Sequence, residues 1–102
     1  MQLSEARRPA DRSVALVDLT IGRLLAQRAA EYPDRTALVG VAHGSGEPRR
    51  LTYAELLTEA TRVAAGLLTL APADSSIALW APNVVEWPIV QYGAALAGLT
   101  LV

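Results

Sequence analysis

The stretch that most constrains the fold is SSIALWAPNVVEWPIVQYGAALAGLTLV, residues 75–102, in which Glu86 is the only charged side chain. A stretch this apolar belongs either to a membrane-spanning helix or to a buried core. A spanning helix needs about 20 consecutive apolar residues. Here Pro82 and Asn83 interrupt the run early, and Glu86 and Gln91 would both be costly to place in hydrocarbon. We therefore predict a core segment and no membrane span.

The same stretch divides into a strand, a helix and a second strand. SIALW is too short for a helix and suits a strand covered on both faces. Asn83 and Glu86 have the spacing of a capping box, which would start a helix, and Gly98 is a natural C-terminal cap. Short connections in this order predict parallel strands joined by a right-handed crossover. The expected elements are a strand at 76–80, a helix at 84–97 and a strand at 99–102.

The first part of the chain is organised differently. Residues 1–17 carry several charges without a sustained period, so we predict a loose arm followed by a partial domain at residues 18–102. Thr20 is suited to cap a helix that Pro33-Asp34 would end. The apolar stripe of this helix is predicted to consist of Ile21, Leu24, Leu25, Ala29 and Tyr32.

A hairpin and a second helix are expected next. TALVGVA and RRLTY are short β-like runs separated by the turn cluster HGSGEP, which predicts a hairpin over residues 36–52. Thr52 and Glu55 form a capping box ahead of a helix at residues 53–70. The apolar face of that helix is predicted to hold Leu56, Leu57, Ala60, Val63, Ala64, Leu67 and Leu68.

Composition excludes several classes of function. The net charge is −1 and all nine basic residues are arginines scattered among acids, so no basic face for nucleic acid is expected. The chain has no cysteine, which excludes disulfides and thiolate zinc sites and fits a reducing cytoplasm. The start, MQLSEARRPADRS, lacks the apolar core of a secretory signal. We predict a cytoplasmic protein.

The residue types that could carry chemistry do not form a constellation. His43 lies in the predicted hairpin loop without a second metal ligand, and Gly44-Ser45-Gly46 is followed by Glu47-Pro48, where a phosphate-binding loop would need a helix. Trp80 and Trp87 lie in apolar runs, so we predict that both pack in the core. No catalytic, cofactor-binding or metal-binding residue is predicted.

The order of the elements nevertheless resembles a known family. Three segments, TIGRLLAQRAAEYPDRTALV, RRLTYAELLTEATRVAAGLL and SIALWAPNVVEWPIVQYGAALAGLTLV, are similar to the N-terminal part of adenylate-forming acyl-CoA synthetases, the AMP-binding superfamily. The match rests on Leu51–Leu56, on Trp80–Asn83, on the pair Glu86-Trp87 and on the start of the next family motif at Gly98–Val102. The resemblance covers about residues 19–102.

The resemblance implies a ligase of the fatty acyl-CoA synthetase type. Such enzymes use ATP and Mg²⁺ to convert a carboxylic acid into an acyl-adenylate and then transfer the acyl group to coenzyme A. This chain departs from the family at Leu70–Ser76, which is shorter, lacks two glycines and retains only Asp74. It contains no lysine, so neither the phosphate-loop lysine nor the C-terminal catalytic lysine of the family is present. None of the family's catalytic positions maps onto a residue here.

These observations lead to one expectation about fold and function. We expect a truncated α/β portion of the large domain of an adenylate-forming enzyme, with a partly parallel sheet, that is catalytically incompetent by itself. ATP, Mg²⁺ and coenzyme A would belong to the complete enzyme. The expected partner is the remainder of the ligase or a second copy of the chain. A stand-alone interaction module derived from the same subfold is the main alternative, and a small membrane-associated protein is a weaker one.

Overall fold

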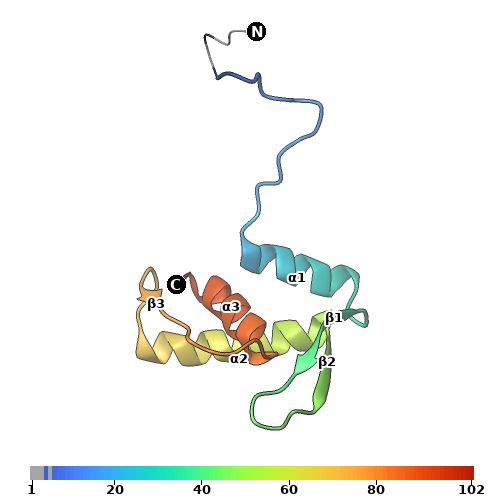
Figure 1. Cartoon of the computed structure of the whole chain (residues 1–102), viewed down its shortest axis with the longest axis vertical. Helices are drawn as coiled ribbons and strands as arrows, with labels where there is room; N and C mark the ends of the chain where they lie inside the picture. Colours follow the sequence, from blue (N-terminus) through green and yellow to red (C-terminus); the bar gives the residue numbers. More distant parts are fainter. Residues whose placement is uncertain (1–3, 5) are drawn as a thin grey trace.

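A computed structural model describes residue 4 and residues 6–102, and it has the predicted α/β architecture. Three helices pack together beside two separate two-stranded sheets, one antiparallel and one parallel (Figure 1). In chain order the elements are α1 (Ile21–Glu31), β1 (Thr36–Val41), β2 (Pro48–Thr52), α2 (Tyr53–Leu70), β3 (Ser76–Ile77), α3 (Glu86–Ala97) and β4 (Thr100–Leu101).

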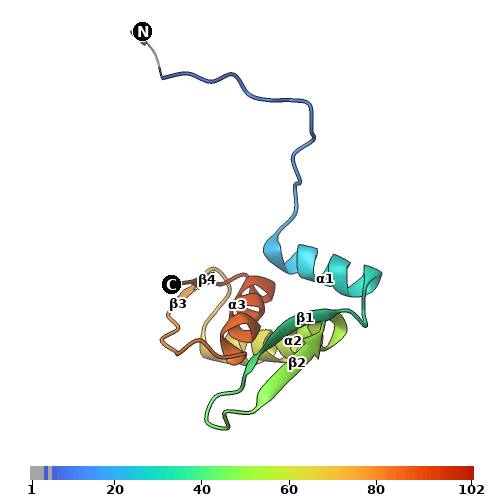
Figure 2. The ribbon, with the colours of Figure 1, turned by 45° about the vertical axis from the view of Figure 1, so that its right-hand side comes forward.

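The segment before α1 lies apart from this body. Residues 6–19 contain no helix or strand, are exposed, and extend away from the rest of the molecule (Figure 2). We refer to residues 6–19 as the arm. Residues 1–3 and 5 of the predicted N-terminal arm lie outside the described residues.

Helix α1 starts where predicted but buries a different face. The Thr20 hydroxyl oxygen accepts a hydrogen bond from the Arg23 N–H at 3.2 Å, which confirms the N-cap. The buried residues of α1 are Gly22, Leu25 and Ala29. The predicted stripe is therefore wrong for Ile21, Leu24 and Tyr32, which are exposed. Gly22 allows α3 to approach, since a Cβ there would lie 3.0 Å from Leu96 Cδ2.

The hairpin and the capping box are confirmed. Strands β1 and β2 pair in antiparallel fashion from Thr36 opposite Thr52 to Val41 opposite Pro48. Two glycines in the connecting loop, Gly44 and Gly46, adopt positive φ, so the Gly-Ser-Gly sequence is a hairpin turn, as predicted. At the start of α2, the Thr52 N–H donates to Glu55 Oε2 at 2.8 Å and the Glu55 N–H donates to Thr52 Oγ1 at 3.2 Å.

The capping box predicts the outcome of one substitution. Thr52→Ala should lower the free energy of unfolding by about 1 kcal/mol, because the Glu55 N–H loses its acceptor. The matched control is Thr61→Ala in the same helix, whose hydroxyl donates only to the Leu57 carbonyl behind it, so this change should cost little. Urea midpoints measure both effects, and equal midpoints for the two variants would contradict the cap's contribution.

The core lies where α2 crosses α3. Ala60 is fully buried, and Gly93 of α3 lies so close to α2 that a Cβ there would be 2.7 Å from Val63 Cγ1. Small side chains on both helices therefore set the close approach of their backbones. Of the predicted apolar face of α2, Leu68 is exposed. The buried residues form two clusters. One contains Leu25, Leu51, Leu56, Ala60 and Ile89, and the other contains Ala64, Ala94, Ala97 and Leu99.

The predicted strand–helix–strand unit is confirmed with shorter strands. Ser76 pairs with Thr100 and Ile77 with Leu101 in parallel register, and the Leu79 N–H extends the pairing by donating to the Val102 carbonyl at 3.1 Å. Gly98 ends α3 in the left-handed conformation expected of a glycine cap, with φ of 72°.

The start of α3 differs from the prediction for a tertiary reason. The helix begins at Glu86, its N-cap is Val85, and no side chain caps it. Asn83 therefore forms no capping box. Val85 is buried and its N–H donates to the Val41 carbonyl of β1, which ties this turn to the hairpin. Both carboxylate oxygens of Glu86 accept from the His43 N–H at 3.2 Å.

The loop between α2 and β3, which lacks the two glycines of the family pattern, is held in place by a backbone hydrogen bond. Asp74 has a φ of 68°, a left-handed conformation that aspartate tolerates better than most residues. Its N–H donates to the Gly98 carbonyl at 3.0 Å. This hydrogen bond connects the loop before β3 to the end of α3, although the loop contains no glycine.

The parallel sheet is covered on one face only. Ile77 and Leu101 pack toward α2 and α3, whereas the alternate residues Ala78, Trp80 and Thr100 are exposed on the other face. We call this the outer face of the sheet. Trp80 is fully exposed, so the prediction that it packs in the core is wrong, because no described element covers the outer face. Trp87 is half-buried on α3.

Candidate functional site

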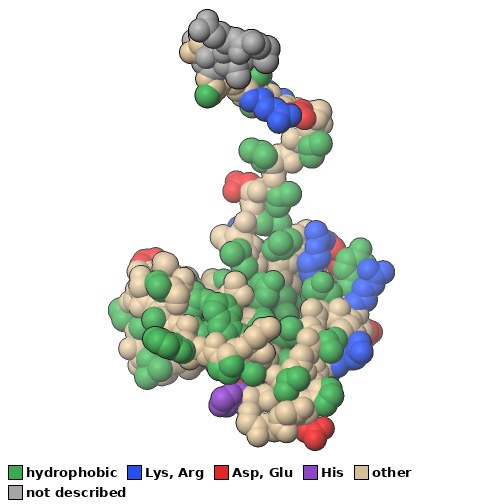
Figure 3. Space-filling model, in the orientation of Figure 1, with side chains coloured by type: hydrophobic (Ala, Val, Ile, Leu, Met, Phe, Trp, Pro, Cys, Tyr) green, Lys and Arg blue, Asp and Glu red, His purple; other side chains and the backbone are tan. Residues whose placement is uncertain are grey.

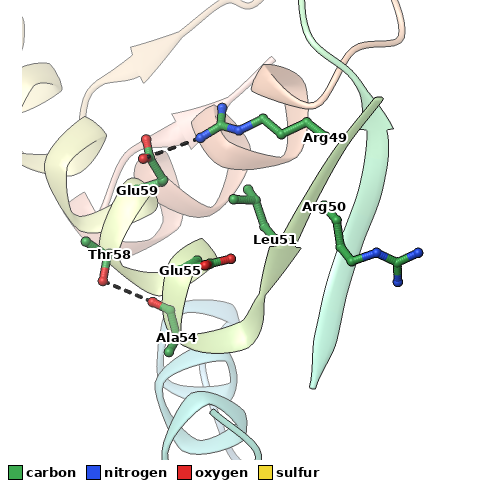
Figure 4. A pocket seen from close by; sticks show the side chains of 7 residues that line it. All are labelled: Arg49, Arg50, Leu51, Ala54, Glu55, Thr58 and Glu59. Atoms are coloured by element: carbon green, nitrogen blue, oxygen red, sulfur yellow. Dashed lines mark hydrogen bonds and ion pairs between the residues drawn. The ribbon is translucent and has the colours of Figure 1, made fainter. Parts of the chain in front are cut away.

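A polar hollow lies between β2 and the first half of α2. It measures about 380 Å³ and is lined by Arg49, Arg50, Leu51, Ala54, Glu55, Thr58 and Glu59 (Figure 4). Arg49 reaches Glu59 with an N–O distance of 3.5 Å, whereas Arg50 points away and donates to Thr36 Oγ1 at 3.1 Å. Glu55 is engaged in the capping box.

Glu59 of this hollow lies near more than one arginine. Glu59 also lies 4.0 Å from Arg62, so two arginines share one carboxylate near solvent. Ion pairs that are this exposed contribute little stability. The arrangement offers no positioned donors for a phosphate and no group poised as a general base.

The hairpin loop does not form a reactive site either. His43 is exposed, as predicted, and its backbone N–H is directed to Glu86. The Ser45 hydroxyl is engaged locally, since it donates to the Ala42 carbonyl at 3.5 Å and accepts from the Glu47 N–H at 3.2 Å. Across residue 4 and residues 6–102, no group of three or more His, Cys, Asp or Glu side chains is placed to hold a metal ion.

One acid in the arm is perturbed by a local interaction. The Ser13 side chain and backbone N–H hydrogen-bond to Asp11 and lower the pKa of its carboxyl. The group is fully exposed and lies in the segment that extends from the body, so this interaction builds no site.

A second hollow is apolar and lies between the start of α1, one flank of α3 and β4. It measures about 320 Å³. We call it the α1–α3 hollow. Its lining carries no charged side chain and one amide, so it can bury an apolar segment but cannot carry out acid–base or phosphoryl chemistry. The lining consists of Ile21, Trp87, Gln91, Ala95, Leu99, Leu101 and Val102.

Comparison with known proteins identifies the family. Residues 25–102 match the model of the AMP-binding enzyme family, which is most of the chain. The chain belongs to the AMP-binding enzymes. The resemblance carried by Leu51–Leu56 and Trp80–Asn83 is thereby confirmed, and these residues lie at the β2–α2 junction and in the loop between β3 and α3.

Individual members of the family are similar over nearly the same residues. The chain is 38% identical over 88 residues to the mitochondrial medium-chain acyl-CoA ligase of Mus musculus, covering 85% of the chain and 14% of that protein. It is 39% identical over 88 residues to a Bacillus subtilis protein named "Putative acyl-CoA synthetase YngI", covering 85% of the chain and 15% of that protein.

A solved structure supports the same assignment. The fatty acyl CoA synthetase of Mycobacterium tuberculosis superposes with a TM-score of 0.62 and 37% identity, over 80% of this chain and 16% of that one. The chain thus corresponds to the N-terminal part of these enzymes and spans about one seventh of the length of the curated relatives that it matches. In the described part of the chain, no helix is both long enough and apolar enough to cross a bilayer.

Proposed function

We propose that this chain is the N-terminal portion of an ATP-dependent fatty acyl-CoA ligase, in which it supplies scaffold and not reacting groups. The 38–39% identity to acyl-CoA ligases over 85% of the chain is the observation that carries the proposal. In the assembled enzyme a fatty acid and ATP would give an acyl-adenylate and pyrophosphate. Coenzyme A would then displace AMP to give the acyl-CoA.

The described residues do not fit a binding site for ATP or Mg²⁺. The Gly44–Gly46 turn closes on itself through Ser45, and no helix follows it to offer backbone N–H groups. Of the two arginines that line the polar hollow, Arg49 is paired with Glu59 and Arg50 donates to Thr36 Oγ1. Arginines that attract ATP without hydrogen-bond donors in fixed positions would stabilise the ground state and the transition state equally. Such binding would not accelerate the reaction. We therefore assign ATP, Mg²⁺ and coenzyme A to the rest of the ligase, and we propose that the assembled enzyme works in the cytoplasm.

A chimeric enzyme tests this function. The matching 88-residue segment of the mitochondrial medium-chain acyl-CoA ligase of Mus musculus is replaced by the corresponding segment of this chain, and fatty-acid-dependent exchange of pyrophosphate into ATP is measured. We expect exchange and acyl-CoA formation by the chimera, and none by the 102-residue chain alone. The enzyme lacking the segment is the control and should be inactive.

Two results would count against the proposal. A folded chimera without exchange would favour the alternative, in which this subfold is a stand-alone interaction module. Exchange by the isolated chain, lost after heat denaturation, would show that it has an active site of its own.

A further inference from the structure

The start of α3 is joined to the hairpin by contacts between residues far apart in the sequence. Val85 is buried, and its N–H donates to the Val41 carbonyl at 3.0 Å. Gly40 lies against Val85, because a Cβ on that glycine would be 2.9 Å from Val85 Cγ1. The turn that leads into α3 therefore meets β1 directly (Figure 2). Both sides of this contact lie within the described residues.

The hydrogen bonds of the hairpin show which edge of β1 this turn meets. The Ala42 N–H donates to the Glu47 carbonyl at 3.3 Å, so Ala42 faces across the hairpin. Neighbouring residues of an extended segment direct their backbone groups to opposite edges. Val41 and His43 therefore direct theirs to the edge away from β2, and the start of α3 contacts them there. Without that contact, the edge would present unpaired N–H and C=O groups.

Glu86 completes this edge with its side chain. The His43 N–H donates to both carboxylate oxygens of Glu86, each at 3.2 Å from the nitrogen. The Val85 N–H and the Glu86 carboxylate thus supply one donor and one acceptor to β1, as the backbone of a neighbouring strand would. Glu86 is half-buried, and a carboxylate accepts from a backbone N–H more strongly than a neutral carbonyl does.

The sequence at the start of α3 explains why this carboxylate is free to reach the hairpin. A capping side chain ordinarily accepts from the second or third N–H of its helix. In α3 the second N–H, that of Trp87, donates to the Val84 carbonyl at 3.1 Å. The third position is Pro88, which has no N–H. Neither position needs a capping side chain, so Glu86 can bind a donor outside its own helix.

We propose that Glu86 holds the hairpin loop against α3 and thereby fixes the backbone of His43 and Gly44 in one position. The other half of the loop is held from within, since the Glu47 N–H donates to Ser45 Oγ at 3.2 Å. The His43 half is held by its bond to Glu86. The loop then presents the only histidine ring of the chain at the surface (Figure 3). This role is independent of the proposed function, because it concerns the loop and not the chemistry of a ligase.

Backbone dynamics of the full 102-residue chain test this role of Glu86. In the unmodified chain, the NMR order parameters of the His43 and Gly44 amides should be about 0.85, the value of a rigid backbone. Glu86→Ala should lower both below about 0.6. It should also accelerate hydrogen exchange of the His43 amide at least about tenfold, because that N–H loses its acceptor. Glu86→Gln keeps one acceptor oxygen and should give intermediate values.

Two controls distinguish release of the loop from a general loosening of the fold. Glu47→Ala removes the same charge from the same loop but keeps the N–H that bonds Ser45, so it should leave the His43 values nearly unchanged. The Ala42 amide, which is paired within the hairpin, should keep its exchange rate in Glu86→Ala. If circular dichroism shows that Glu86→Ala has lost its helices, the same comparison is made with Glu86→Gln. Unchanged His43 order parameters, equal acceleration at Ala42, or an equal effect of Glu47→Ala would each overturn the proposal.

Discussion

Gly93→Ala is expected to lower the free energy of unfolding by about 2–3 kcal/mol, the cost of overpacking a close helix contact. The added Cβ would lie 2.7 Å from Val63 Cγ1, 2.9 Å from Val63 Cβ and 3.1 Å from the Ala60 carbonyl oxygen. A flexible side chain could turn away, but Val63 is β-branched and the Ala60 carbonyl is helix backbone. The helices α2 and α3 must therefore separate.

Gly66→Ala is the matched control, because Gly66 also lies inside a helix but has no neighbouring atom within 4 Å of the place that a Cβ would occupy. This change should raise the free energy of unfolding by about 0.5–1 kcal/mol, since alanine restricts the unfolded chain more than glycine does. Urea midpoints and slopes measure both variants. Adding Val63→Ala to Gly93→Ala should recover part of the loss. Stabilisation by Gly93→Ala alone would show that α2 and α3 do not approach as described.

The isolated chain is expected to self-associate through the outer face of the parallel sheet. Parallel strands are ordinarily buried on both faces, yet Trp80 is fully exposed and Ala78 and Thr100 beside it are exposed. Trp80→Ser should weaken the association at least about tenfold, since tenfold corresponds to only about 1.4 kcal/mol and a buried tryptophan removes a large apolar area from water.

Sedimentation velocity over a range of concentrations measures this association. Val39→Ser is the control, because Val39 is an exposed apolar residue on the hairpin strand β1 and not on the outer face. It should leave the association constant nearly unchanged. A concentration-independent monomer with a sharp cooperative melt would contradict the expectation, and so would equal weakening by the two variants.

The site was harder to anticipate than the fold. The sequence offered no catalytic constellation, and in the structure the polar groups near the first hollow are engaged with each other, as with Arg49 and Glu59. The α1–α3 hollow, in contrast, had no signal in the sequence. It depends on how α1, α3 and β4 meet, and its lining residues come from three separate parts of the chain.

Elements whose causes are local could be predicted from the sequence. The capping box of Thr52 and Glu55, the 3.6-residue period of α2 and the left-handed glycine at Gly98 each act within one or two helical turns. The order of strand, helix and strand was enough to predict that the segments at 76–80 and 99–102 run parallel, and the structure shows this pairing at Ser76 and Thr100. Such features depend on neighbouring residues, so the pattern of the chain contains the needed information.

Features that depend on distant partners were settled only by the packing of the folded chain. Gly22, and not Ile21, faces the core because Leu96 of α3 packs against it. Glu86 accepts from the His43 N–H, 43 residues away, and not from a capping partner at Asn83. Trp80 has apolar neighbours in the sequence, as a core residue would, but it is exposed in the structure. Its burial would require another element to cover its side of the sheet, and the described part of the chain places none there.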